Sequence, residues 1–337
     1  MNAPSRSSTR GRRRPLAALA GCACALALTL TGCGVPDSAE EAAGWTFTDG
    51  TGAEVALPER PERVVAYSGI ASVLWDYGFE VVGVFGPAET AGGGRDPQIG
   101  DVDLDRVEVI SQTYGEMSVE RLAALEPDLV ITQVYDDVDW YLPEGGTDQI
   151  EAVAPLARIQ MNGVPAEQQL TDHLDLAVAL GAEPEDPRVT EARDDFDAAL
   201  AELDAAVEAR PGLRVMAVSA APENFFVVNS AAGGALGMFA DHGVSLPETE
   251  APDTDQFERL SWEEADKYPA DLLLQDARPG RTTLAELDDQ PLWRDLPAVR
   301  AGQVGDWPAE TPFGYAAYAE MVSGLAADIE DAEPLDH

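Results

Sequence analysis

The segment MSVERLAALEPDLVI, residues 117–131, combines a helix start, a short helix and a buried strand within fifteen residues. Ser118, two residues before Glu120, lies at the expected start of a helix. Its hydroxyl can accept a hydrogen bond from one of the first N–H groups of that helix. The apolar residues that follow are spaced as one face of a helix, and Pro127 ends that helix. Residues 128–131, DLVI, then predict the opening of a strand that is buried on both faces.

A partial copy of this segment occurs 143 residues later, as LSWEEADKYPADLLL at residues 260–274. In the copy Ser261 corresponds to Ser118 and Glu263 to Glu120, and the strand again begins with Asp-Leu. Two copies of one helix–strand unit, half a chain apart, predict two similar α/β lobes.

A long helical pattern lies between the two copies, at Arg188–Arg210. Phe196, Leu200, Leu203 and Val207 form one apolar face over three turns. A helix of this size reaches roughly 35 Å, so we expect a rigid connection between the lobes. Because strands alternate with helices on both sides of it, the predicted fold class is α/β: two Rossmann-like lobes with mostly parallel sheets, joined by one long helix.

The N-terminus has the pattern of an export signal. Arginines at 10 and 12–14 precede an apolar run, Leu16–Leu30, which is too short to span a membrane comfortably. The run ends in Leu-Thr-Gly-Cys33, which resembles the lipobox of bacterial lipoproteins, so we expect Cys33 to carry a lipid. An ordinary secretory signal with a chance cysteine is the alternative, and Arg12-Arg13 leaves a twin-arginine route open. The predicted organisation is a signal peptide (1–32), a flexible tether (33–44), an N-terminal lobe (45–186), the interlobe helix (187–210), a C-terminal lobe (211–330) and a polar tail (331–337).

Removal of the signal leaves a chain with unusual cysteine content and charge. Cys22 and Cys24 lie in the removed segment, so the exported protein keeps only Cys33 and relies on its core without an internal disulfide. The full chain has 62 acidic and 21 basic residues, a formal charge of −41; without residues 1–32, 16 basic residues remain and the charge is −46. Such a surface repels nucleic acid and anionic lipid headgroups. It favours solubility, or attraction of a neutral or cationic ligand.

Several segments together resemble the substrate-binding lipoproteins of ABC importers for ferric siderophores, haem and cobalamin. They are, besides the two units above, PERPERVVAYS (58–68), DYGFEVVGV (76–84) and PLWRDLPAVRAGQV (291–304). The resemblance implies two α/β lobes bridged by one helix, with ligand in a shallow cleft between them. It also implies that Glu120 and Glu263, one on each lobe, dock onto arginines of the membrane permease. The alternative is that each acid only favours the positive end of its helix.

In a parallel-sheet fold, ligand meets the loops beyond the carboxyl ends of strands, and these loops are rich in aromatic residues. Aromatic rings stack on flat apolar ligand surfaces and offer an OH or NH group. We expect Phe225 and Phe226 to fill the core instead. Tyr114 lies where this family often supplies a ligand contact. The candidate aromatic ligand contacts are Tyr67, Tyr114, Tyr135, Trp140, Tyr141, Trp307, Phe313 and Tyr315.

Arg278 and Arg281 follow the predicted strand Leu272–Leu274 and are the candidate basic contacts. A guanidinium would bind carboxylate, catecholate or hydroxamate oxygen through charge-assisted hydrogen bonds. A solvated surface loop is the equally weighted alternative.

Direct metal binding and catalysis have little support in the sequence. The three histidines, at 173, 242 and 337, are not paired at ligand spacing. Asp136–Asp139 lacks the glycine turn and bidentate glutamate of a calcium-binding hand loop. The sequence also has no GxSxG, HExxH or P-loop motif.

These observations predict a monomeric, lipid-anchored binding protein on the extracytoplasmic face of the membrane. It would capture a ferric siderophore and deliver it to ABC permease and ATPase subunits, with no resident cofactor, metal or catalytic residues. Aromatic loops and few basic residues favour a hydroxamate-type or otherwise uncharged chelate. The alternatives are a haem- or cobalamin-binding protein of the same family and, in a different class, a lipid-anchored cell-wall hydrolase.

Overall fold

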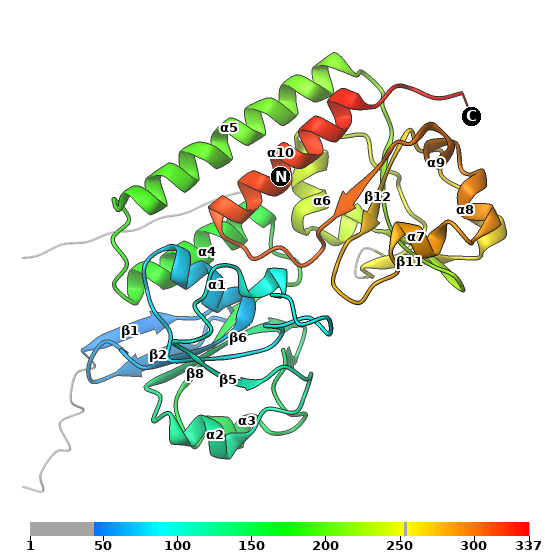
Figure 1. The fold of residues 1–337 in the computed structure, drawn as a ribbon. Coiled ribbons are helices and arrows are strands. Elements are labelled where there is room, and N and C mark those ends of the chain that lie inside the picture. Colours follow the sequence, from blue (N-terminus) through cyan, green and yellow to red (C-terminus); the bar gives the residue numbers. More distant parts are fainter. Residues whose placement is uncertain (1–43, 253–254, 337) are drawn as a thin grey trace, which may run out of the picture. The chain divides into compact units, whose positions relative to one another are not determined.

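The computed structural model describes residues 44–252 and 255–336 (Figure 1). The predicted signal peptide and Cys33 lie outside the described residues. Within the described part, no helix has both the length and the apolar composition needed to cross a bilayer.

The N-terminal lobe is built on a sheet whose central strands, β3, β4 and β6, are buried on both faces. β3 pairs in parallel with β4 and β6, β4 pairs in parallel with β5, and β6 pairs in parallel with β8 and antiparallel with the short β7. In Figure 1, α1 and α4 lie on one side of this sheet, and α2 and α3 on the other. The elements are β1 (Trp45–Thr48), β2 (Glu54–Leu57), β3 (Val64–Tyr67), α1 (Ser68–Asp76), β4 (Gly83–Phe85), η1 (Pro97–Ile99), β5 (Glu108–Ser111), α2 (Val119–Ala124), β6 (Leu129–Tyr135), β7 (Val138–Asp139), α3 (Thr147–Glu151), β8 (Leu156–Gln160) and α4 (Ala166–Ala179).

The C-terminal lobe has a five-stranded sheet in the order β11-β10-β9-β12-β13. Here β9, β12 and β13 are parallel, whereas β10 runs antiparallel to both of its neighbours. Apolar residues of α6 and α10 contribute to the core on one face of the sheet, and residues of α7, α8 and α9 to the core on the other. The elements are β9 (Val215–Ala221), β10 (Asn224–Val228), η2 (Ser230–Ala232), α6 (Gly234–Asp241), β11 (Phe257–Leu260), η3 (Trp262–Glu264), β12 (Leu272–Asp276), α7 (Leu284–Leu287), α8 (Pro291–Asp295), α9 (Pro297–Ala301), β13 (Val304–Trp307) and α10 (Tyr315–Asp331).

One long helix, α5 (Pro187–Ala209), connects the lobes, within one residue of the predicted range at either end. Asp186 caps it by accepting a hydrogen bond from the Arg188 N–H, and a proline at the first position suits a helix start. Val189, in its first turn, packs in the core of the N-terminal lobe. Phe196 and Leu203 pack in the core of the C-terminal lobe, where α10 lies alongside α5 (Figure 1).

The two predicted copies form equivalent parts of the two sheets. Val64 pairs with Leu129 in the first sheet, and Val215 pairs with Leu272 in the second. One residue before each pair, an aspartate binds the chain that precedes the first strand. Asp128 accepts hydrogen bonds from the backbone N–H groups of Glu62 and Arg63. Asp271 accepts them from the backbone and the guanidinium of Arg214, at 2.7–2.9 Å. The predicted repeat is therefore structural, and it fixes where strands begin.

Three parts of the chain differ from the sequence-based expectation. The copy at residues 261–268 forms only the short 3₁₀ turn η3, although Ser261 still donates to Glu264 at 2.9 Å. Residues 86–106 are rich in Gly and Asp and therefore predict a surface loop, but within them the turn η1 carries Ile99 into the core. The polar tail is bound along its backbone: the Leu335 N–H donates to Asp271 at 2.8 Å, and the Leu335 side chain packs against the adjoining core.

Candidate functional site

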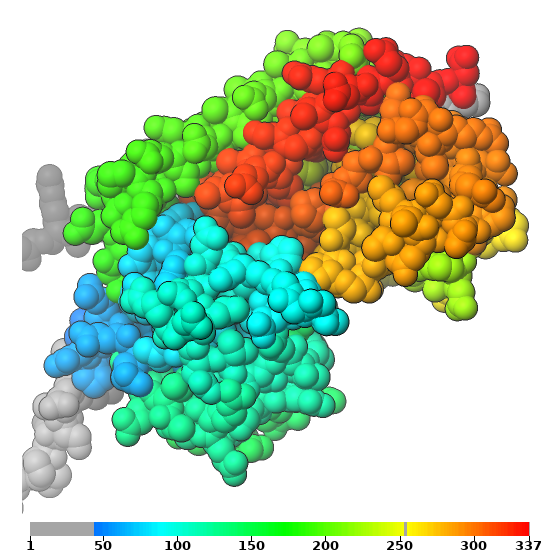
Figure 2. All heavy atoms as spheres, in the orientation of Figure 1, coloured from blue at the N-terminus to red at the C-terminus, as the bar shows by residue number. Residues whose placement is uncertain are grey.

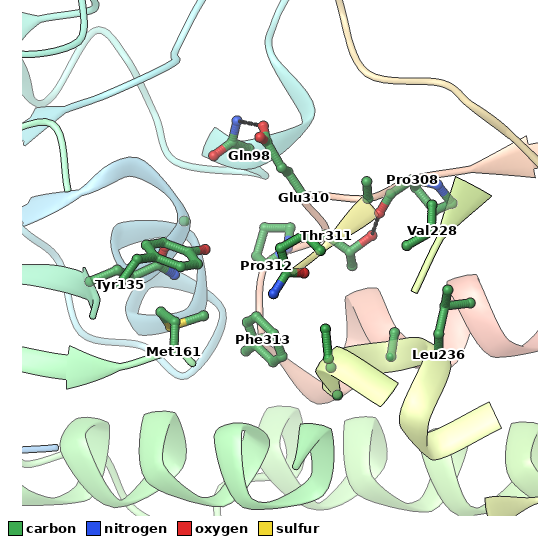
Figure 3. A pocket seen from close by; sticks show the side chains of 18 of the residues that line it. Gln98, Tyr135, Met161, Val228, Leu236, Pro308, Glu310, Thr311, Pro312 and Phe313 are labelled. Carbon is green, nitrogen blue, oxygen red and sulfur yellow. Dashed lines mark hydrogen bonds between the residues drawn. The ribbon is translucent and has the colours of Figure 1, made fainter. Parts of the chain in front are cut away.

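A cleft between the lobes, in an inner and an outer part, is lined by eight of the ten predicted contact residues, of which Tyr135 and Phe313 are labelled in Figure 3. Tyr67 and Tyr135 enter it from the carboxyl ends of β3 and β6, and Trp307 from the end of β13. This placement follows the rule that ligand sites of α/β sheets lie beyond the carboxyl ends of parallel strands. The inner part of the cleft has a free volume of about 150 Å³.

Five aromatic rings form a continuous wall on the N-terminal side of the cleft. The ring centroids of Tyr135 and Trp140 are 4.8 Å apart, and those of Trp140 and Tyr114 are 5.0 Å apart. Tyr141 lies 5.3 Å from Tyr114 and 5.5 Å from Tyr67, which completes the series. We call these five residues the aromatic wall. Tyr114 is 49 % exposed, so the wall extends from the buried floor of the cleft to solvent.

Backbone conformation holds this wall in position. Tyr141 has φ = 62°, a left-handed conformation that a bulky side chain rarely adopts, which turns the chain sharply after β7. Gly86 has φ = 106°, and a Cβ atom there would lie 2.6 Å from the ring of Tyr67. A side chain at position 86 would thus displace the Tyr67 ring.

Opposite the wall, Arg278 belongs to a charge cluster in which Asp276 is buried and Glu310 is exposed. Its guanidinium donates to both carboxylate oxygens of Asp276, at 2.8 and 2.7 Å, and to Glu310 at 2.8 Å. Burial alone would lower the pKa of Arg278, but the bonds to Asp276 and the charge of Glu310 raise it above its ordinary value. Arg281 lies at the mouth, more exposed, with its Nε 3.7 Å from Asp276. Both arginines line the outer part of the cleft, which has a free volume of about 280 Å³.

A hydrogen-bonded bridge crosses the cleft from one lobe to the other. The Gln98 amide nitrogen donates to Glu310 at 2.6 Å (Figure 3). The Tyr67 hydroxyl donates to the Gln98 carbonyl oxygen. Gln98 belongs to the N-terminal lobe, whereas Glu310 lies between β13 and α10. Because both residues line the inner and the outer parts of the cleft, the bridge stands between the two. In the space-filling view, the cyan part of the N-terminal lobe lies against the orange part of the C-terminal lobe (Figure 2).

Three tyrosines of the wall, Tyr67, Tyr135 and Tyr141, are held in their neutral form. Burial raises the pKa values of Tyr67, Tyr135 and Tyr141, and the nearby carboxylate of Glu310 raises all three further. These phenols therefore keep their protons at neutral pH. They can donate hydrogen bonds to a bound molecule, but they are poor phenolate ligands for a bare ferric ion.

Two of the predicted aromatic contacts, Phe313 and Tyr315, lie where the chain enters α10. The Phe313 ring lines the cleft and stacks on His173, with centroids 5.7 Å apart. Tyr315 does not line the cleft: its ring packs 5.6 Å from Phe196 on α5, and its backbone N–H donates to the hydroxyl of Tyr77. In the described structure, eight of the ten predicted contacts line the inner or the outer cleft. The two that do not are Tyr114, which belongs to the aromatic wall, and Tyr315, which does not.

The two predicted docking glutamates are both exposed. Glu120 lies in the first turn of α2 and Glu263 in η3, one on each lobe. Neither carboxylate forms an ion pair with a described residue. Of the two phenylalanines predicted to fill the core, Phe225 is fully buried, whereas Phe226 is only partly buried, with its ring 6.1 Å from that of Phe257.

Sequence reasoning missed the residues that bridge the cleft. Gln98 lies in a segment that reads as a surface loop, and Glu310 is one of 62 acids, so composition hides it. Its only signal is its position between Trp307 and Phe313, both predicted contacts. Asp139 of the acidic loop forms an ion pair with Arg158 at 2.8 Å. Among the described residues, no group of three or more His, Cys, Asp or Glu side chains is arranged to hold a metal ion.

Two lobes on one helical backbone, with an aromatic cleft between them, form the arrangement of a binding protein. Residues 96–311 match the family model described as periplasmic binding protein, so the chain belongs to that family. This confirms the family and the fold class predicted from the sequence.

Individual relatives match the chain to different extents. The crystal structure of DesE, a ferric-siderophore receptor protein from Streptomyces coelicolor, is 38% identical, with a TM-score of 0.80 over 86% of this chain and 99% of that one. Staphylococcus aureus SirA, solved with staphyloferrin B, shares the fold at 18% identity and a TM-score of 0.62, over 86% of this chain and 99% of that one. The Fe(3+)-citrate-binding protein YfmC of Bacillus subtilis (strain 168) is 24% identical over 201 residues, which span 59% of each chain.

Proposed function

We propose that this protein captures a ferric siderophore in the interlobe cleft and delivers it to an ABC permease. The observation that carries the proposal is the aromatic wall: five rings in mutual contact, four of which line the cleft while the fifth, Tyr114, is exposed beside it. Such a surface suits a bulky, largely apolar chelate that carries iron within it. The relative DesE, a ferric-siderophore receptor, and YfmC, an Fe(3+)-citrate-binding protein, support the same class of ligand.

The iron would arrive already chelated. The phenols that face the cleft are neutral, and the nearest basic group, Arg278, is bound to two carboxylates. The protein would therefore contact the organic shell of the chelate and leave the metal to the siderophore's own oxygens.

The charges in the cleft favour an uncharged ferric centre. The charged side chains that line the inner and outer cleft are Asp96, Arg278, Arg281 and Glu310, two acids and two bases. With no excess positive charge, these side chains would bind an anionic tris-catecholate weakly and a hydroxamate-type chelate well.

Quenching of tryptophan fluorescence tests this assignment, because Trp140 and Trp307 line the cleft. We expect saturable quenching by ferrioxamine, whose ferric tris-hydroxamate centre is uncharged, and at least tenfold weaker binding of a ferric tris-catecholate. Tight haem or cobalamin binding without a response to ferrioxamine would overturn the proposal. Turnover of a cell-wall or ester substrate, with no saturable binding, would support a hydrolase instead.

We further propose that the protein acts as a monomer on the extracytoplasmic face of the membrane, held by a lipid on Cys33. Replacing Cys33→Ser should block incorporation of labelled palmitate and release the protein from cell membranes. Unchanged labelling in that variant would contradict the anchor. Glu120 and Glu263 are the proposed contacts with the permease, which works with its ATPase subunits.

A further inference from the structure

The C-terminal lobe has a second hollow, separate from the cleft, with a free volume of about 590 Å³. Its floor consists of core side chains, among them Met216, Leu273 and Leu296, each no more than 7 % exposed. Trp262 and Leu292 stand at its rim, and Leu292 is 36 % exposed. None of the residues that line it lines the inner or the outer cleft. We call this hollow the C-lobe groove.

The internal repeat accounts for the opening of the groove. In the register that relates residues 117–131 to 260–274, Ala265 occupies the position of Leu122. Leu122 is fully buried on α2 and fills the space beneath that helix. In the second copy the helix is reduced to the turn η3, and Ala265 contributes only a methyl group to the floor of the groove. The C-terminal lobe thus lacks the side chain that closes the equivalent place in the N-terminal lobe.

The rim of the groove is negatively charged. Glu263 and Asp266 form no ion pair with a described residue. Lys267, the one cation that lines the groove, is bound to Glu250 at 2.9 Å and to Glu258 at 2.6 Å, so its charge is already compensated. An apolar floor with an acidic rim complements a partner segment that combines a large apolar side chain with a basic neighbour.

We propose that the C-lobe groove receives an extracytoplasmic loop of the permease, through an apolar side chain flanked by arginine or lysine. This inference rests on the proposed function, and it adds an apolar anchor beside Glu263. Buried apolar anchors contribute more to the affinity of an interface than exposed ion pairs at its edge. The groove, rather than the charge of Glu263 alone, would then set the affinity of the C-terminal lobe for the permease.

Site-specific photocrosslinking in cells tests the groove directly. The full-length lipoprotein would carry p-benzoylphenylalanine in place of Leu292, and peptide sequencing would identify its partner. The same residue in place of Leu284 is the matched control, because Leu284 is another exposed leucine of this lobe, 40 % exposed, outside the groove. We expect a crosslink to the polytopic permease subunit from position 292 and a yield at least tenfold lower from position 284. Equal yields, or a different partner, would overturn the proposal.

A second crosslinking experiment uses variants that fill or alter the groove. Ala265→Leu restores the side chain found in the first copy, and it should reduce the crosslink at least tenfold while ferrioxamine quenching stays unchanged. Should that variant fold poorly, Leu292→Ser, with the photoreactive residue in place of Asp295, makes the same test without adding volume. A wild-type crosslink yield in the folded variant would reject the groove. Loss of ferrioxamine quenching in the wild type would count against the proposed ligand, and it would not alter the crosslinking result.

Discussion

Asp76, the last residue of α1, shows how a single carboxyl can set pH-dependent stability. Burial, together with the charges of Asp101 and Glu320, raises its pKa from 3.8 to about 6. The folded protein therefore binds this proton more tightly than the unfolded chain. The ionised form reduces stability above about pH 6, and the reduction disappears as the pH falls toward 3.8.

We predict that Asp76→Asn raises the free energy of unfolding by about 1–3 kcal/mol at pH 7.5 and has little effect near pH 4. Urea denaturation at several pH values measures this. Glu320→Gln, which removes one of the neighbouring charges, should give a smaller change of the same sign. A destabilisation that is equal at pH 4 and pH 7.5 would contradict this account.

Trp140 is the residue of the aromatic wall that touches three other rings, those of Tyr114, Tyr135 and Tyr141. Trp140→Leu should weaken ferrioxamine binding about 5- to 30-fold, since a lost aromatic contact is worth roughly 1–2 kcal/mol. Isothermal titration calorimetry measures the change. Trp75→Leu is the matched control, because Trp75 is also a partly exposed tryptophan of the N-terminal lobe but lies outside the cleft. Equal losses in both variants would indicate a general loss of stability.

At the scale of elements, the hydrogen bond from Gln98 in η1 to Glu310, between β13 and α10, holds a negatively charged carboxylate in the cleft. Glu310→Gln removes a negative charge and frees part of the Arg278 guanidinium. Binding of a ferric tris-catecholate should then improve about tenfold relative to ferrioxamine, a change of about 1.4 kcal/mol. Competition titrations compare the two chelates.

Glu330→Gln is the control for that prediction, because Glu330 is an exposed glutamate on α10 that does not line the cleft. If Glu310→Gln changes both affinities by the same factor, Glu310 does not discriminate by charge.

The same scale separates what the sequence could predict from what it could not. The apolar periodicity and the helix caps are enough to predict α5, and the apolar run before Tyr135 is enough to predict β6. Both elements are specified by residues close together in the sequence. Gln98 lines the cleft because η1 folds against α1, and Glu310 lines it because the two lobes lie close together. Both contacts join residues far apart in the sequence, so no local sequence pattern predicts them. The sequence predicts a helix at residues 261–268, but the structure has only the short 3₁₀ turn η3 there. Helical spacing of apolar residues does not show whether the surrounding chain will stabilise a second turn.

At the scale of the whole molecule, delivery requires both lobes to present their docking residues together. We predict that changing both Glu120→Lys and Glu263→Lys abolishes uptake of ⁵⁵Fe-ferrioxamine by cells while the affinity for ferrioxamine is unchanged. A matched double variant, Glu183→Lys with Glu330→Lys, makes the same change in charge at other exposed positions and should transport normally. If uptake survives the first double variant, docking does not depend on this pair.

The joint between the lobes has one further consequence. Because α5 is anchored in one core by its first turn and in the other core by the turns that follow, with α10 packed along it, large-scale bending would break apolar contacts in both halves. Ligand capture should consequently leave the radius of gyration almost unchanged. A fluorescent iron-chelate sensor made from this scaffold would then respond best with its dye beside Tyr114, and poorly with a donor–acceptor pair at the far ends of the lobes.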